Sequence, residues 1–410
     1  MQEPRPPATA GSSQLVRQHN AQRVLESMWG REARTASELM AVTGLTRATI
    51  LTLCRQLSDQ GWLRISENSR QVGQYTKGRP ATRYAFRQDA CFVIGVDAGQ
   101  HRIDASVADL RGEEIGGAQR PVDPPAPDDD ESAMLLRRRE VAAVIDSALE
   151  DAGLERDAVA SVAIAVPAPV DKAGISPEGF GHFWGQMNPD LISLGTERGW
   201  NSVVENDANL AALAELELME APQRESFAAL LSGERLGAGL VMGGQLVPQP
   251  RGAAGELGIL DLVRGVESSH GFGWWARHLA YEALTAAETP TGALSGIPPE
   301  QVTSEDVFAA ARDGDPLADE IMDTLAEKLA RVCAVLAGLL DLDRIVISGA
   351  MASALPGVVE LAKEKLPHHL NAPWLHIEVS SLGAAAVRRG AVRLAIERIK
   401  SEVLQSPLAK

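Results

Sequence analysis

Four polar side chains at helical spacing, early in the chain, are suited to contact duplex DNA. They are Arg47, Thr49, Thr52 and Arg55. A guanidinium group donates to phosphate oxygens or to the O6 and N7 acceptors of guanine, and a threonine hydroxyl pairs with either kind of base edge. Three further basic residues follow in a glycine-containing stretch: Lys77, Arg79 and Arg83. Presented on one surface, these side chains would form a nucleic-acid interface.

The segment that carries the first four side chains predicts a helix-turn-helix. A weakly amphipathic helix is expected over 14–29, and a shorter helix follows a cap at Thr35 or Ser37. Gly44 then allows the left-handed backbone of a tight turn. Thr46 is placed to cap the next helix, because a threonine oxygen satisfies free backbone N–H groups there.

The helix after the turn has one apolar and one polar face. It is expected to end near Gln60, before Gly61. The apolar residues recur at i, i+3, i+4 and i+7 and should be buried: Ile50, Leu53, Cys54 and Leu57. The four polar side chains lie on the opposite face, so the helix would enter the major groove with its N-terminus leading.

Two alternating stretches after this helix predict a β-hairpin. Residues 62–66 and 82–87 have the period-two pattern of strands, and the polar residues between them contain Gly78 and Pro80. Such a hairpin is the wing of a winged helix. Its basic side chains are expected at or near the tip, with Arg79 placed to reach a narrow minor groove.

Charge is divided unevenly along the chain. Residues 1–87 contain 13 Lys and Arg against 6 Asp and Glu, a net charge of +7, although the whole chain carries −16. The remaining residues therefore carry −23. A small basic module on an acidic body is typical of a DNA-binding protein, because the body repels phosphate. The alternative is a helical adaptor with solvated arginines.

Composition argues against several other classes of protein. No apolar run reaches the roughly 18–20 residues of a membrane-spanning helix. Residues 1–13 lack the apolar centre of a signal peptide, and we interpret them as a disordered leader. The three cysteines, Cys54, Cys91 and Cys333, form no Cys-x-x-Cys pair, which favours the cytoplasm and argues against disulfides or a thiolate zinc site.

Beyond the basic module, strands alternate with helices in both halves of the chain. Buried strands are expected over 92–99 and 159–166 in the first half, and over 227–231 and 344–349 in the second. Repeated strand-turn-strand patterns followed by helices predict a duplicated α/β domain, with a ligand cleft between its lobes. The predicted domains are 1–13, 14–87 and 88–410.

Five motifs occur in the order found in the ROK family of repressors, open reading frames and sugar kinases. They are Ile94-Gly-Val-Asp-Ala-Gly, Val204-Glu-Asn-Asp-Ala-Asn, Gly252-Ala-Ala-Gly-Glu-Leu-Gly, Ile345-Val-Ile-Ser-Gly-Ala and Leu382-Gly-Ala-Ala-Ala-Val-Arg-Arg-Gly-Ala. The chain resembles this family from residue 14 onward. The resemblance implies an α/β fold with an N-terminal winged helix-turn-helix and a two-lobed, actin-like or sugar-kinase-like domain of the duplicated ribonuclease H-like type.

The resemblance also implies a sugar site between the lobes. Asn206 and Asp207 match the family's sugar-binding Asn and general-base Asp, and Glu256 matches a sugar-contacting Glu. A carboxylate beside an amide has the acceptors and donors for two sugar hydroxyls. The alternative is that Asp207 merely caps the helix that begins at Ala208.

The chain departs from the family's kinases at the phosphate turns. The family's Asp-x-Gly-Gly-Thr-Lys reads Asp97-Ala-Gly-Gln-His-Arg here, and Gly-Thr-Gly-x-Gly reads Gly233-Glu-Arg-Leu-Gly. The changes remove close backbone approach to phosphate, and Glu234 adds a negative charge unless its side chain points away. Phosphoryl transfer depends on placing and neutralising phosphates, so we do not expect an enzyme.

The family's zinc site is altered as well. Ile259 stands where the family has His, Ala276 where it has a sugar-contacting Glu, and no cysteine lies near. We therefore expect neither zinc nor another cofactor. Trp274 and Trp275 would either stack on a sugar or pack a repaired core, and we favour packing.

The leading hypothesis is a cytoplasmic transcriptional regulator, a repressor without membrane association. It would bind double-stranded operator DNA as a homodimer or homotetramer, and a sugar or sugar derivative would act as effector. One alternative is an ATP-dependent sugar kinase with an added DNA-binding domain. Another is a regulator without an effector, whose body serves only for assembly.

Overall fold

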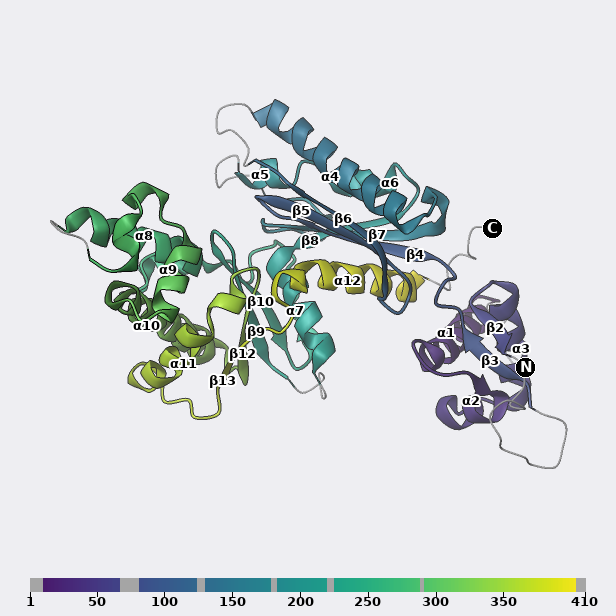
Figure 1. The fold of residues 1–410 in the computed structure, drawn as a ribbon. Helices are drawn as coiled ribbons and strands as arrows, with labels where there is room; N and C mark the ends of the chain where they lie inside the picture. Colours follow the sequence, from purple (N-terminus) through teal and green to yellow (C-terminus); the bar gives the residue numbers. More distant parts are fainter. Residues whose placement is uncertain are drawn as a thin grey trace, which may run out of the picture.

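The computed structural model describes residues 10–66, 81–123, 130–177, 183–219, 225–287 and 291–402. The chain forms a helical N-terminal module and a body of two lobes, each built on a five-stranded sheet (Figure 1). Across these ranges, no helix combines the length and the apolar character needed to cross a membrane.

Three helices and a small antiparallel sheet make up the N-terminal module. The helices are α1 (Ala10–Met28), α2 (Ala36–Thr43) and α3 (Arg47–Asp59). The strands are β1 (Arg34–Thr35), β2 (Leu63–Ser66) and β3 (Arg83–Phe86), with β3 in the centre. The predicted helices and the two paired hairpin strands are confirmed. α1 begins inside the segment predicted as a leader, and no helix-breaking proline follows Pro7 there.

Capping residues define the ends of α2 and α3. Thr35 accepts the backbone N–H of Glu38, whose carboxylate accepts the N–H of Thr35 in return. Gly44 follows α2 with a φ of 69°, a conformation that side chains with a Cβ rarely adopt. Thr46 accepts the N–H of Thr49 at the start of α3. The predictions for Thr35, Gly44 and Thr46 are confirmed.

Trp29 fixes the module to the first lobe. Its indole N–H donates to the carbonyl oxygen of Leu110 at 2.7 Å, and its ring centroid lies 4.5 Å from that of Phe86. The Lys400 ammonium lies 5.2 Å from the same indole ring. Apolar residues of the module and of the lobe, including Ile399, form one continuous core. The module is therefore packed onto the body.

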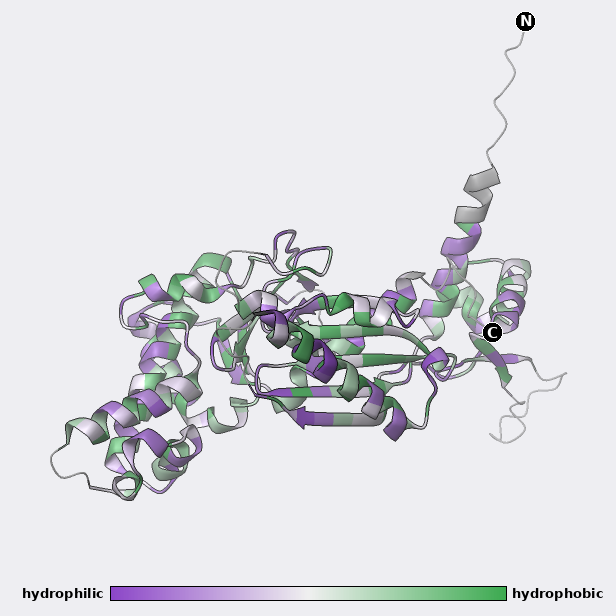
Figure 2. Cartoon of the chain, turned by 90° about the horizontal axis from the view of Figure 1, so that it is seen from above, coloured by the Kyte–Doolittle hydropathy of each residue, from purple (hydrophilic) through white to green (hydrophobic). Residues whose placement is uncertain are grey.

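The first lobe contains a mixed sheet of order β6-β5-β4-β7-β8. Its strands are β4 (Phe92–Ala98), β5 (Arg102–Ala108), β6 (Glu114–Pro121), β7 (Val159–Val166) and β8 (Asn201–Asn206). β4, β5 and β6 are antiparallel, whereas β4, β7 and β8 are parallel. One face is covered by α4 (Asp130–Ala152), α5 (Phe183–Met187) and α6 (Ile192–Thr196). Figure 2 shows hydrophobic residues along the central strands, which are buried on both faces.

The second lobe repeats this arrangement in the order β11-β10-β9-β12-β13. Its strands are β9 (Phe227–Ser232), β10 (Leu236–Met242), β11 (Gln245–Leu246), β12 (Arg344–Ser348) and β13 (His376–Val379). Again three neighbours are antiparallel and three are parallel. The helices α8 (Phe272–Ala286), α9 (Ser304–Arg312), α10 (Pro316–Leu340) and α11 (Pro356–Lys365) share one apolar core with this sheet. The predicted duplicated α/β body is confirmed.

Two helices lie between the sheets: α7 (Asp207–Leu218) and α12 (Ala386–Glu402) (Figure 1). Glycines let them pack closely. A Cβ at Gly390 of α12 would lie 1.8 Å from the carbonyl oxygen of Leu210 on α7. A Cβ at Gly239 of β10 would lie 2.1 Å from the carbonyl oxygen of Ala208 on α7. A Cβ at Gly95 of β4 would lie 2.6 Å from the backbone nitrogen of Val392 on α12. The pair α7–α12 is therefore in tight contact with both lobes.

Candidate functional site

Two arginines lie on the exposed face of α3. Its other face is buried by the four predicted apolar residues, Ile50, Leu53, Cys54 and Leu57. Arg47 and Arg55 lie exposed, two turns apart on the helix. Neither guanidinium makes an ion pair or hydrogen bond with other side chains in the described part of the chain. Both side chains are free to reach phosphates or base edges.

The two threonines of α3 are engaged within the module. The Thr52 hydroxyl donates to the carbonyl oxygen of Ala48 at 2.9 Å, although the residue is exposed. The Thr49 hydroxyl lies 2.9 Å from that of Thr46 and belongs to the helix cap. Thr52 therefore faces outward with its hydrogen already donated, and Thr49 is half-buried beside the cap.

Of the predicted wing residues, the structure describes only Arg83. Its Nε and Nη2 atoms donate to the carbonyl oxygen of Ala33 at 3.1 and 2.6 Å, and Nη2 lies 3.5 Å from the Glu38 carboxylate. Arg83 thus ties β3 to the start of α2. Lys77 and Arg79 lie outside the described residues.

Three carboxyl groups come together where the lobes meet: those of Asp97, Asp207 and Glu256. Asp97 is near the end of β4, Asp207 begins α7, and Glu256 belongs to the second lobe. Burial raises the pKa of Asp207 to about 8, and the negative charges of Asp97 and Glu256 add to this shift. Burial also raises the pKa of Asp97 to about 7. The structure therefore brings Asp207 and Glu256 together and adds Asp97.

Asn206, rather than Asp207, is the N-cap of α7. Its Oδ1 accepts the backbone N–H groups of Ala208 and Asn209 at 3.0 and 3.2 Å, and its Nδ2 donates to the carbonyl oxygen of Ala168. The Asp207 carboxylate also accepts the N–H of Ala208, at 2.8 Å. Asn206 thus positions the start of α7, and with it the carboxyl group of Asp207.

A buried arginine holds the turn that follows β4. Arg137 of α4 donates to the carbonyl oxygens of Ala98 and Gly99, the latter at 2.9 Å. Desolvation lowers the pKa of Arg137 to about 10, while the negative charge of Asp97 opposes that shift. The guanidinium therefore fixes one of the two turns in which the sequence departs from the kinases.

Glu234 connects that turn to the turn between β9 and β10. Its carboxylate lies 3.2 Å from Nη2 of Arg277 on α8 and 3.8 Å from Nε2 of His101. The neighbouring Arg235 donates to the Ser269 hydroxyl, and its charge opposes the burial that raises the pKa of Glu256. Charged side chains thus occupy the region between two turns that would have to approach phosphate closely.

The tryptophans of α8 belong to a stack of rings. Trp274 lies between His270 and His278, with centroid distances of 3.8 and 4.4 Å. Trp275 meets Trp274 edge-on at 5.1 Å, and the Lys328 ammonium lies 3.7 Å from the Trp275 centroid. These contacts favour the packing interpretation over stacking on a sugar.

The same region does not fit a zinc ion. Over the ranges described, no three His, Cys, Asp or Glu side chains are placed to hold a metal. Cys54, Cys91 and Cys333 are buried free thiols on other elements, and Cys333 of α10 is the one that shares the apolar core of α8. A zinc–thiolate site requires cysteine ligands close to one another, and α8 contains no cysteine.

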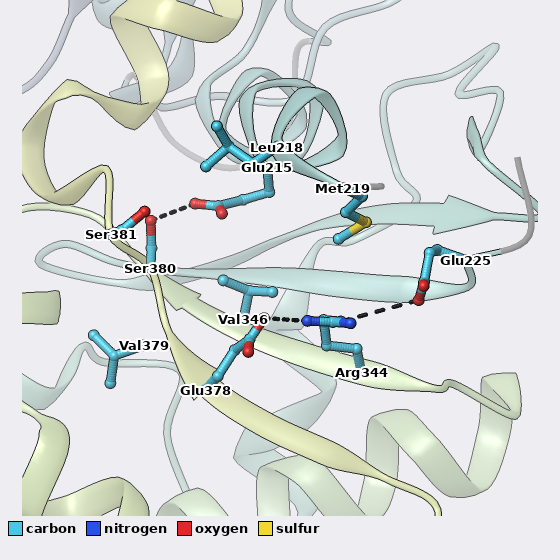
Figure 3. Close-up of a pocket in the computed structure, with 10 residues that line it drawn as sticks. All are labelled: Glu215, Leu218, Met219, Glu225, Arg344, Val346, Glu378, Val379, Ser380 and Ser381. Carbon is cyan, nitrogen blue, oxygen red and sulfur yellow. Dashed lines mark hydrogen bonds and ion pairs between the residues drawn. The ribbon is translucent and has the colours of Figure 1, made fainter. Parts of the chain in front are cut away.

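A cavity of about 530 Å³ lies beside α7 on the second lobe (Figure 3). Glu215 of α7, 6% exposed, accepts hydrogen bonds there from Ser348 and Ser380. Arg344 pairs with Glu378 at 2.6 Å on the opposite wall. Ser348 ends β12 and Ser380 follows β13. Glu215 therefore connects α7 to the carboxyl ends of these two strands of the second sheet.

The sequence alone places Asp97 only in a phosphate turn and does not identify Arg137 or Arg235 as parts of a site. The position of Asp97 in the sequence could have indicated a site, because ligands of α/β proteins bind at the carboxyl ends of the strands and Asp97 lies near such an end. The position of Arg137 gave no such indication, since it occupies a helix that pattern alone places on the surface.

Comparison with known proteins identifies the family of the chain and solved structures with the same fold. A model of the ROK family matches residues 93–398. The chain is similar in structure to a ROK family transcriptional regulator described as a homolog of the E. coli MLC protein, with a TM-score of 0.71, 20% identity, and coverage of 95% of this chain and 100% of that one. It is also similar to a ROK family glucokinase from Streptomyces griseus in complex with glucose and AMPPNP (TM-score 0.61, 23% identity, 75% and 99% coverage).

Two relatives by sequence are enzymes. The chain is 30% identical over 250 residues to the bifunctional enzyme NanE/NanK of Brucella melitensis, covering 57% of this chain and 43% of that enzyme. It is 28% identical over 167 residues to a glucokinase of Halalkalibacterium halodurans, covering 37% and 49%. The chain thus spans less than half the length of either of these two relatives.

Proposed function

Because the chain belongs to the ROK family, we propose that it is a DNA-binding transcriptional regulator that acts as a repressor. The observation that carries the proposal is α3, a capped helix with Arg47 and Arg55 exposed on one face. It lies within a segment of net charge +7 that is packed on an acidic body. In a helix-turn-helix, this helix enters the major groove.

The domains divide the work in this proposal. Residues 14–87 bind operator DNA through α3 in the major groove. Lys77, Arg79 and Arg83 lie near a second contact surface, where the wing reaches the minor groove. Residues 88–410 bind the effector and assemble the protein as a homodimer or homotetramer in the cytoplasm. A two-fold axis through the body would present two modules to two half-sites of an operator.

A sugar or sugar derivative is the proposed effector, bound between the lobes by Asp207 and Glu256 with Asn206 holding Asp207 in place. A raised pKa makes a carboxyl group a donor as well as an acceptor near neutral pH, which suits sugar hydroxyls. Asp207 begins α7, which packs on α12, and α12 ends beside Trp29. Lobe closure around a ligand would therefore act on the module, provided the two states differ in ligand affinity.

Binding to DNA is tested by fluorescence anisotropy with promoter fragments, including the region upstream of the gene itself, at low and moderate salt. We expect the double variant Arg47→Ala/Arg55→Ala to bind at least tenfold more weakly and to lower the slope of log affinity against log salt by up to about 2. Arg139→Ala/Arg251→Ala, which removes two exposed arginines of the body, is the charge-matched control and should bind normally. Unchanged binding by the double variant would contradict the proposal.

Sugar phosphorylation is the second candidate function. It is favoured by Asp207, which stands at the position of the family's general base, and by the kinases among the relatives. Glu234 argues against phosphorylation. It places a negative charge in a phosphate turn, whereas phosphoryl transfer requires the charge of the phosphates to be neutralised. An ADP-release assay with ATP and a panel of hexoses decides between the two: turnover that Asp207→Asn abolishes would establish the kinase.

A further inference from the structure

The exposed face of α3 between its two arginines is apolar. The residues that face outward there are Ala48, Leu51 and Thr52, and the Leu51 side chain is 38% exposed. Isolated exposed leucines are common on protein surfaces. Leu51 differs in that it lies one turn from Arg47 and one turn from Arg55, in the middle of the proposed DNA-contacting face.

This part of the helix surface lacks a free hydrogen-bond donor. The hydroxyl group of Thr52 donates to the carbonyl oxygen of Ala48 at 2.9 Å, so its hydrogen is not available to a base edge. Thr49, the next polar residue, is half-buried and its hydroxyl lies 2.9 Å from that of Thr46. Ala48, Leu51 and Thr52 are therefore neighbouring exposed residues that each carry a methyl group and have no free side-chain donor.

The major groove contains one apolar group that matches such a surface. Guanine, adenine and cytosine present donors and acceptors but no methyl group there, whereas thymine also presents its C5 methyl group. A leucine placed over an unpaired donor or acceptor would leave that group without water and without a partner, which is unfavourable. Close contact with an apolar side chain is therefore most favourable at thymine.

We propose that Ala48, Leu51 and Thr52 form a methyl-reading strip that selects thymine at the centre of each operator half-site. From residue 48 to 52 the helix rises about 6 Å, comparable to two base-pair steps of about 3.4 Å each. The strip thus covers one or two adjacent A·T pairs, and Arg47 and Arg55 contact phosphate or guanine on either side. This inference rests on the proposed DNA-binding function and specifies the base class read.

The test begins with selection of duplex DNA from a random pool by the full-length protein, followed by anisotropy measurements on the best site. Each thymine in the half-site is replaced by deoxyuridine, which removes only the C5 methyl group and keeps the pairing edge. At one or two central positions we expect binding about fourfold weaker, equivalent to about 0.8 kcal/mol, the value of one buried CH₂ or CH₃ group.

Leu51→Ala should bind the thymine and deoxyuridine sites with equal affinity at those positions. Val42→Ala, which truncates an exposed apolar residue of α2 (57% exposed), is the matched control and should keep the full difference. Thermal melting of both variants should match the unsubstituted protein, because both side chains are exposed.

The outcomes separate the two proposals. If no sequence is enriched and no duplex binds, the regulator proposal itself fails. If a site is enriched but deoxyuridine binds as well as thymine throughout, or if Leu51→Ala keeps the thymine preference, the methyl-reading strip is refuted while DNA binding stands.

Discussion

Replacing Asp207 with asparagine should make the protein more stable, and increasingly so as pH rises. The Asp207 carboxyl lies beside Asp97 and Glu256, and its pKa is raised from 3.8 to about 8, mainly by burial. A raised pKa means that the folded state favours the protonated form, so stability from this group is present at low pH and lost as pH rises towards 8. Asparagine cannot ionise and so avoids this loss.

The size of the effect follows from the pKa shift. A difference of about four pKa units corresponds to an upper bound of about 6 kcal/mol at 1.36 kcal/mol per unit. Solvent screening and local relaxation reduce this, and we expect about 2 kcal/mol at pH 8. The asparagine Oδ1 can still accept the N–H of Ala208, which the aspartate accepts at 2.8 Å, so the start of α7 should stay intact.

Differential scanning fluorimetry between pH 4.5 and 8.5 measures this directly. About 2 kcal/mol should raise Tm by about 4–8 °C at pH 8 for lobes of this size, with little difference at pH 4.5. Asp157→Asn, an exposed aspartate in the first lobe, is the control and should leave Tm unchanged at every pH. A Tm gain that does not vary with pH, or a loss of stability at pH 8, would refute the desolvated carboxyl cluster on which the effector proposal depends.

Two further predictions concern packing within the body and the joint between body and module. Gly390→Ala should destabilise the protein by about 3 kcal/mol or more, because its Cβ would lie 1.8 Å from the Leu210 carbonyl oxygen; Gly357→Ala, with open space around it, should be neutral or stabilising, and urea unfolding compares them. Trp29→Phe removes the hydrogen bond to the Leu110 carbonyl oxygen and should cost about 1–3 kcal/mol, and limited proteolysis should then cleave more readily between module and body. Equal proteolysis rates for both proteins would contradict this role of Trp29.

Local signals in the sequence were sufficient for the helix ends of the helix-turn-helix. Thr35, Gly44 and Thr46 mark helix ends because caps and left-handed turns depend only on neighbouring residues. The role of Arg83 could not be predicted in this way. Its partners, Ala33 and Glu38, lie 50 and 45 residues away in sequence, and only tertiary packing brings them to β3.

The same contrast holds for the body. The apolar runs of β4, β7, β9 and β12 predicted buried strands, because strands covered on both faces contain little else. β6 and β13, both at sheet edges, were not predicted, since their residues are largely exposed and lack a regular pattern. The composition of the site was missed for a related reason: Asp97 and Asp207 meet only because β4 and α7 converge where the lobes join.

The position of Glu234 bears on how such a body could change from catalysis to sensing. In the sequence alone, this residue adds a negative charge to a phosphate turn; in the structure it pairs with Arg277 and His101 across the two turns. All three side chains are more than a third exposed, so the pairs contribute roughly 1 kcal/mol or less and would not prevent the lobes from moving. By contrast, the backbone contacts of Gly390 and Gly239 leave no space for sliding. In the proposed regulator, weak bridges between the turns and rigid contacts along α7 and α12 would let motion at the site pass to Trp29 and the module.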